Sequence, residues 1–218
     1  MITAFGALTA WTAVTFSFTV AGEINSSGPY VYDVALTASP DANPLPRFAP
    51  LPVINGNNPN GRMAGSPTHF VEFNSANPKT QFPFTLYRFE PGSLAVFAPS
   101  TRGEIAQFDK FSKGYRTLTF TLYSKMLADT DQAARKLQFL QVNILTMSRL
   151  ANLGSGPRVI DSLGDSRNVN GLNQFLTIDL RRNGTYRNDD KLEPKGDTFG
   201  GSDPDVDIVD YKISVTLP

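Results

Sequence analysis

The sequence has no cysteine and only one histidine among its 218 residues. Without cysteine, the chain can form no disulfide bond, no cysteine-ligated zinc or iron–sulfur centre and no thiol nucleophile. The single histidine, His69, cannot build a histidine-rich metal site, and any Ser–His–Asp arrangement would have to use it. No Gly-x-Ser-x-Gly motif is present either. These absences predict that the protein is not an enzyme.

Charged residues are also scarce, and their signs balance. They make up 18% of the chain, with 20 Lys and Arg against 20 Asp and Glu, whereas about 25% is usual in soluble domains. No excess of basic residues is available to contact phosphates, so nucleic acid is not expected as a partner. A formal net charge of zero also does little to oppose self-association.

The residues that are present favour β-structure. Residues 14–20 alternate strictly between apolar side chains and Thr or Ser, which is typical of a strand with one buried face. Further strands are predicted at residues 30–37, 69–73, 82–90, 93–98, 117–124, 137–147, 175–182 and 207–217. One short helix is predicted over 125–137. Roughly nine strands and one helix indicate an all-β antiparallel β-sandwich, either jelly-roll or immunoglobulin-like.

The same patterns suggest how the chain is organised. One sandwich domain is expected over 14–218, because an all-β domain can absorb this length and no internal repeat is visible. Residues 38–68 form a long Pro-, Asn- and Gly-rich loop, and loops of this length are usually functional or serve as interaction arms. The segments 69–73 and 82–90 are expected to form a hairpin. Residues 1–13 form an apolar extension ahead of the sandwich.

The first twenty residues are apolar but do not have the form of a targeting segment. No Lys or Arg lies near Met1, and the run is rich in Thr, so neither a secretory signal nor a transmembrane helix is predicted. An exposed apolar tail would be an aggregation hazard. The segment is therefore expected either to pack on its own sheet or to complete the sheet of a neighbouring copy. The candidate self-assembly residues are Ile2, Phe5, Leu8, Trp11, Val14, Phe16 and Phe18.

Three alternating aspartates near the C-terminus form a candidate cation site: Asp203, Asp205 and Asp207. Calcium prefers several oxygen ligands, often supplied by such loops, although the EF-hand spacing is absent here. Asp161 and Asp165, in a second loop, are possible additional ligands. The alternative is a solvated loop whose aspartates hydrogen bond to their own backbone.

Carbohydrate binding needs exposed aromatic rings with polar partners, and Tyr30 and Tyr32 are the candidates for it. The alternative for both is a structural role, because aromatic side chains bury a large apolar area. A single tryptophan, Trp11, makes an aromatic binding platform less persuasive.

The order of the segments THFVEF, FTLYRF, LTFTLYS, LQVNILTM, FLTIDLR and DPDVDIVDYKISV resembles uncharacterised bacterial secreted or lipoprotein domains of carbohydrate-binding-module type. The resemblance implies a β-sandwich without catalytic residues. Such proteins usually begin with a signal and a lipobox cysteine, which this sequence lacks.

These observations lead to two functional hypotheses. The first is a non-enzymatic structural protein, extracellular or on the cell surface, that forms a homopolymer such as a filament or matrix fibre through N-terminal strand addition. The second is a monomeric carbohydrate-binding module, stabilised by calcium, whose partner is a glycan.

Overall fold

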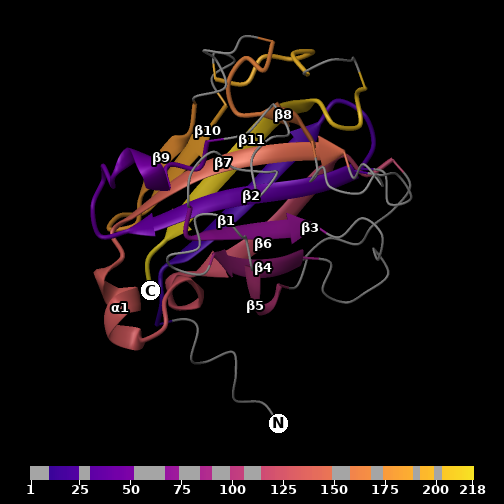
Figure 1. Ribbon diagram of the computed structural model, residues 1–218. Helices are drawn as coiled ribbons and strands as arrows, with labels where there is room; N and C mark the ends of the chain where they lie inside the picture. Colours follow the sequence, from indigo (N-terminus) through magenta and orange to yellow (C-terminus); the bar gives the residue numbers. More distant parts are fainter. Residues whose placement is uncertain are drawn as a thin grey trace.

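The computed structural model describes residues 10–24, 30–51, 67–73, 84–89, 99–105, 114–148, 158–167, 174–188, 192–198 and 203–218. In these residues the chain folds into two antiparallel β-sheets and one short α-helix (Figure 1). The predicted all-β sandwich is therefore confirmed.

The smaller sheet has four strands in the order β10-β11-β1-β6. Its strands are β1 (Ala13–Val20), β6 (Thr117–Tyr123), β10 (Gly184–Arg187) and β11 (Ile208–Thr216). Strand β1 is central: Phe16 lies opposite Ile213 of β11 on one side and opposite Phe120 of β6 on the other. Strands from both ends of the sequence and from its middle thus meet in one sheet.

The larger sheet runs in the order β5-β4-β3-β2-β7-β8, and β9 pairs with β7 next to β8. Its strands are β2 (Tyr30–Ser39), β3 (His69–Phe73), β4 (Phe84–Phe89), β5 (Pro99–Ile105), β7 (Phe139–Ser148), β8 (Arg158–Ser162) and β9 (Leu176–Asp179). Strands β3 and β4 pair antiparallel, which confirms the expected hairpin. Strand β8 pairs with residues 145–148 of β7 and β9 with residues 139–142, so the two short strands share one edge.

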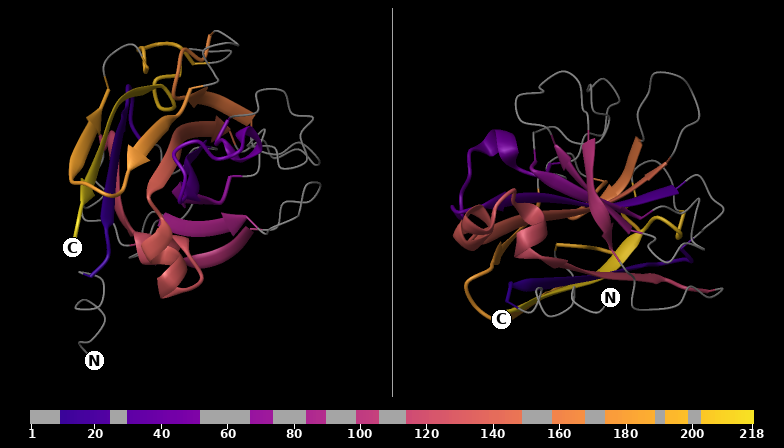
Figure 2. Two further views of the ribbon diagram at one scale, coloured as in Figure 1. Left: turned by 90° about the vertical axis from the view of Figure 1, so that its left-hand side faces the viewer. Right: turned by 90° about the horizontal axis from the view of Figure 1, so that it is seen from below.

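The hydrophobic core lies between the facing sides of the two sheets. Figure 2 shows the two sheets from two further directions. Alternation along β1 directs Phe16 and Phe18 inward, where each is at most 1% exposed. The Phe16 ring stacks on Phe120 with 5.0 Å between centroids, and Phe84 of the larger sheet lies 4.9 Å from Phe120. Aromatic side chains therefore join the two sheets at the centre of the core.

The predicted helix over 125–137 is shorter and divided. A 3-10 helix, η2 (Ser124–Leu127), is followed by extended backbone at Ala128 and then by α1 (Asp131–Lys136). The side chain of Thr130 accepts a hydrogen bond from the amide of Ala133 (3.1 Å) and so caps α1 at its start. A second 3-10 helix, η1 (Pro46–Phe48), lies within the predicted loop 38–68.

Several strands differ from those expected. Strands β5, β8 and β10 were not predicted, and the strand expected at 93–98 lies outside the described residues. Strands β8 and β10 have only five and four residues, too few for an alternating pattern to stand out. Each pairs with the strand next to it in chain order, β8 with β7 and β10 with β11.

We expect Phe16→Ala to lower the free energy of unfolding by about 3–5 kcal/mol, because it leaves a cavity beside Phe120 at the junction of the sheets. Urea denaturation followed by circular dichroism would measure the change. Ser17→Ala is a matched control on the outer face of the same strand, and its effect should stay within about 1 kcal/mol. Equal losses for the two variants would contradict the assigned facing of β1.

Candidate functional site

The N-terminal residues proposed for self-assembly are only partly described. Ile2, Phe5 and Leu8 lie outside the described residues. Trp11 is 6% exposed, with the Arg135 guanidinium 4.6 Å from its ring centroid. The other candidates on β1, which are Val14, Phe16 and Phe18, point into the core. The described part of this segment therefore completes the sheet of its own chain.

Strand β6 forms one edge of the smaller sheet. Beyond its two ends, the Ser124 amide donates to the Thr12 carbonyl and the Val20 amide donates to the Arg116 carbonyl, both at 2.9 Å. Since backbone groups of an antiparallel strand face its two neighbours alternately, the even-numbered residues of β6 bond to β1. The backbone groups of four residues then point away from the sheet: Thr117, Thr119, Thr121 and Tyr123. No described strand pairs with this edge.

Small hydroxyl side chains cover the outer face of β1 and β6. The hydroxyls of Thr15 and Thr121 lie 2.8 Å apart, as do those of Thr19 and Thr117. The Thr119 hydroxyl donates to the Ser17 hydroxyl at 3.2 Å. These cross-strand pairs satisfy one another without charge, so this edge of β6 lies beside a neutral part of the surface.

The loop containing Asp203 and Asp205 fastens the two sheets together at one end of the sandwich. The Tyr30 hydroxyl donates to the Asp203 carboxylate, and the Tyr32 hydroxyl donates to the Asp205 carbonyl at 2.9 Å. The Asp205 carboxylate accepts from the Glu23 amide at 2.9 Å. A Cβ atom on Gly22 would lie 2.7 Å from the Pro204 carbonyl carbon, so a side chain there would collide with the loop.

These contacts change the interpretation of the two tyrosines. Tyr32 is 1% exposed and packs against Phe73, with 6.0 Å between ring centroids. The Tyr30 hydroxyl is held by Asp203. The structure therefore does not present Tyr30 and Tyr32 as an exposed aromatic pair, and it gives both a role in joining the sheets.

The predicted aspartate site is also arranged differently. Asp203 and Asp205 make the loop contacts just described, and Asp207 accepts hydrogen bonds from the Gly196 amide at 2.9 and 3.1 Å. Among the described residues, the acidic groups that come together are instead Asp161, Glu193 and Asp197, each with a carboxylate oxygen within 4.8 Å of the others. Of the predicted residues, only Asp161 belongs to this buried acidic cluster.

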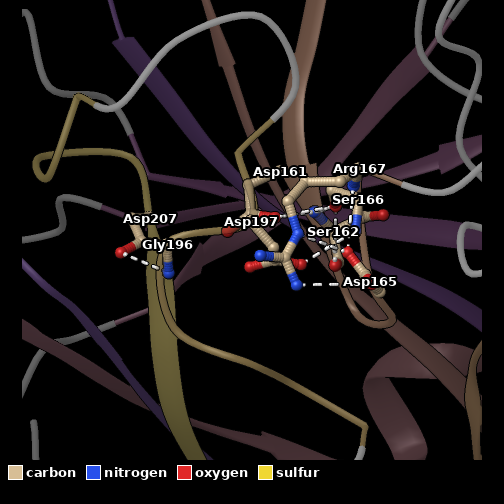
Figure 3. A network of polar contacts seen from close by, with 8 residues as sticks. All are labelled: Asp161, Ser162, Asp165, Ser166, Arg167, Gly196, Asp197 and Asp207. Carbon is tan, nitrogen blue, oxygen red and sulfur yellow. Dashed lines mark hydrogen bonds and ion pairs between the residues drawn. The ribbon is translucent and has the colours of Figure 1, made fainter.

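The cluster is built from segments that are distant in the sequence, and Figure 3 shows two of its members, Asp161 and Asp197. Asp161 lies on β8, whereas Glu193 and Asp197 lie between β10 and β11. One Asp161 oxygen accepts from the Ser166 hydroxyl (2.8 Å) and the other from the Ile208 amide (2.7 Å). Asp161 thus links the edge of the larger sheet to the first residue of β11 in the smaller sheet.

Burial changes the acidity of all three carboxyl groups. It raises the pKa of Glu193 to about 12, with further increases from the nearby charges of Asp161 and Asp197. Burial likewise raises the pKa of Asp161 well above its usual range, assisted by Asp197. The pKa of Asp197 is raised to about 6, again mainly by burial and against the hydrogen bond from the Ser166 amide. Each group would release its proton more readily beside a cation.

His69 has a structural environment. Its side chain is 3% exposed, and Nδ1 lies 2.9 Å from the Thr68 hydroxyl. That hydroxyl in turn donates to the Leu36 carbonyl at 3.2 Å on β2. The observed contacts of His69 therefore connect β3 to the neighbouring strand, as expected for a histidine that supports a sheet.

No protein-family model, curated protein or solved structure matches the chain. The resemblance to secreted carbohydrate-binding-type domains thus stays a prediction.

Within the described ranges, none of the helices has the length and apolar character needed to span a membrane.

We expect Tyr30 to ionise near pH 12 rather than 10, because the hydrogen bond to Asp203, burial and nearby negative charge all favour its protonated form. Nuclear magnetic resonance of the labelled tyrosine ring carbons would measure this, with Tyr30→Phe used to assign the signal. The interaction stabilises the folded state below pH 10, and that contribution is lost as the pH rises from 10 to 12. Asp203→Asn should bring the pKa back toward 10, and an unchanged value would contradict the assigned contact.

Proposed function

We propose that the chain is a non-enzymatic structural protein, extracellular or on the cell surface, that assembles with copies of itself by β-strand addition. The observation that carries this proposal is the outer edge of β6. This seven-residue strand, TLTFTLY, contains no charge, no proline and no bulge in its pairing with β1. Natural sheets usually protect their edges with such features, because an open edge is a template for another strand.

The described structure supports the edge of β6, rather than the place of β1, as the position where a strand from another copy is added. Strand β1 already pairs with β6 and β11 in its own chain, and its apolar side chains fill the core. Exchanging β1 between copies would require opening that core. Adding a strand beside β6 requires only that the outward groups of Thr117, Thr119, Thr121 and Tyr123 find partners.

The apolar residues 2–9 are the proposed donor segment. They immediately precede the described residues that lead into β1, and at eight residues they are long enough to span the seven residues of β6. They contain no charged side chain and no proline, so they can pair along the whole edge. A contact between the start of one chain and β6 of the next is head-to-tail, and it forms a filament when it does not close into a ring.

Two features support a non-enzymatic role. The acidic cluster is sealed from solvent: Asp161, Glu193 and Asp197 are each at most 1% exposed. The only histidine is buried beside Thr68.

Glycan binding has less support, because Tyr32 is buried and Tyr30 is engaged with Asp203.

We expect Thr119→Pro to weaken self-association about tenfold or more. Proline removes the outward amide of β6 and also obstructs an added strand, and one hydrogen bond contributes about 1 kcal/mol. Sedimentation velocity over a range of protein concentrations would measure the effect. Thr119→Ala is the matched control, since it removes the same side chain but keeps the amide. If both variants assemble equally, the edge of β6 is not the contact.

We expect deletion of residues 2–9 to leave a folded monomer, because Trp11 and β1 are retained. Light scattering coupled to gel filtration would report the mass, and circular dichroism would confirm the fold. A synthetic peptide of residues 1–10 should bind this truncated protein and should bind its Thr119→Pro form more weakly. Assemblies of unchanged size after the deletion would contradict strand donation by this segment.

A further inference from the structure

The buried acidic cluster contains polar atoms that the described residues leave without hydrogen-bond partners. Both Glu193 oxygens, Oδ1 of Asp197 and the Ser162 hydroxyl make no hydrogen bond of standard geometry and are inaccessible to solvent, although the Gly164 amide is close enough to lower the pKa of Glu193. Glu193 is only 1% exposed, and Asp197 and Ser162 are fully buried. Leaving buried carboxylate oxygens without partners is strongly unfavourable, so this arrangement calls for a group that they can bind.

Among the described side chains, no buried basic group compensates these carboxylates. Among the described residues, none of the buried polar side chains belongs to Lys or Arg. The ion pair between Arg167 Nε and Asp165 Oδ1, at 2.9 Å, is on the surface, and both side chains are substantially exposed. Asp165 and Arg167 flank Ser166, whose amide and hydroxyl bind Asp197 and Asp161. No described side chain therefore places a positive charge inside the cluster, and a bound cation would supply one.

The chemical type of the ligand atoms in the cluster indicates which cation it would bind. All three acidic groups supply oxygen, and neither histidine nor cysteine belongs to the cluster, which disfavours zinc and other softer metals. Ligand oxygens of calcium lie at about 2.3–2.6 Å, so two of them on opposite sides of the ion are about 5 Å apart. The three carboxylate oxygens fit within this span, at 4.8 Å or less from one another. Magnesium prefers to keep several waters, which suits a sealed carboxylate cluster less well.

We propose that Asp161, Glu193 and Asp197 bind one calcium ion inside the sandwich, with the Ser162 hydroxyl as a further oxygen donor. Asp207 is a positioning residue, because its carboxylate accepts from the Gly196 amide, next to Asp197. The ion would join β8 of the larger sheet to the segment between β10 and β11 of the smaller sheet. It is a structural site, and it does not depend on self-association.

The first test compares the full chain in chelator and in 1 mM calcium. We expect calcium to raise the melting temperature by about 5–10 °C, as for a ligand present at roughly one hundred times its Kd. Isothermal titration calorimetry should give one site per chain, and magnesium should produce a smaller shift. The absence of a calcium shift would overturn the proposal, and a larger shift with magnesium would overturn the choice of calcium.

Glu193→Gln separates ion binding from ordinary structural damage. The variant keeps the shape of the side chain but removes its charge, so calcium affinity should fall at least tenfold. In chelator, the same variant should melt at or above the temperature of the unaltered protein, because a neutral amide replaces a buried acidic group whose oxygens make no hydrogen bond of standard geometry. Asp197→Asn provides a second variant with the same two expectations. If either folded variant keeps the full calcium shift, the assigned ligands are wrong.

Two further variants serve as matched controls. Asp205→Asn lies in the loop whose aspartates the sequence favoured as ligands, and Asp210→Asn removes an exposed charge on β11. Both should keep the calcium shift of the unaltered protein. Loss of the shift in Asp205→Asn would move the site to the 203–207 loop and overturn the assignment. Sedimentation of all samples in both buffers keeps any change in assembly apart from ion binding.

Discussion

The packing of β1 between β6 and β11 is the constraint on which the rest of the structure depends. One edge of β1 pairs with β11, near the end of the chain, and the other with β6, from its middle. Its inner face supplies Phe16, which stacks on Phe120 and so reaches the aromatic contact with the larger sheet. Because its bonding edges and its apolar face are used together, β1 cannot be removed without opening both the sheet and the core.

Polar groups at one end of the sandwich add hydrogen bonds between the two sheets to the apolar contacts of the core. Tyr30, Tyr32 and Asp205 join the larger sheet to the segments around β1 and β11 through hydrogen bonds. Asp161 makes a similar link to the amide of Ile208. Where such a junction is buried, its polar groups must satisfy one another. The loop contacts meet this requirement internally, whereas the acidic cluster is left with oxygens that a cation would satisfy.

The long, regularly alternating strands could be predicted from the sequence, and the short ones could not. Strands β1 and β6 bury every second residue, and β11 does so from Tyr211 onward, so their side chains alone reveal the pattern. Strand β8 is only five residues long and contains Asp161, whose carboxylate is buried by partners from other segments. The predicted helix was too long. The backbone is extended at Ala128, and the Thr130 cap means that α1 begins only at Asp131.

The sequence by itself determined the all-β class and the inward face of the N-terminal strand, because alternation depends only on neighbouring residues. It also predicted a cation site made of acidic side chains, but it favoured aspartates that are close in the chain: Asp203, Asp205 and Asp207. Only the tertiary structure decided which carboxylates share a site, since Asp161, Glu193 and Asp197 meet through the contact of two sheets. Strand order decided likewise that β1 is central and β6 is an edge. Pairings between distant segments depend on how the whole chain packs, and no local pattern specifies them.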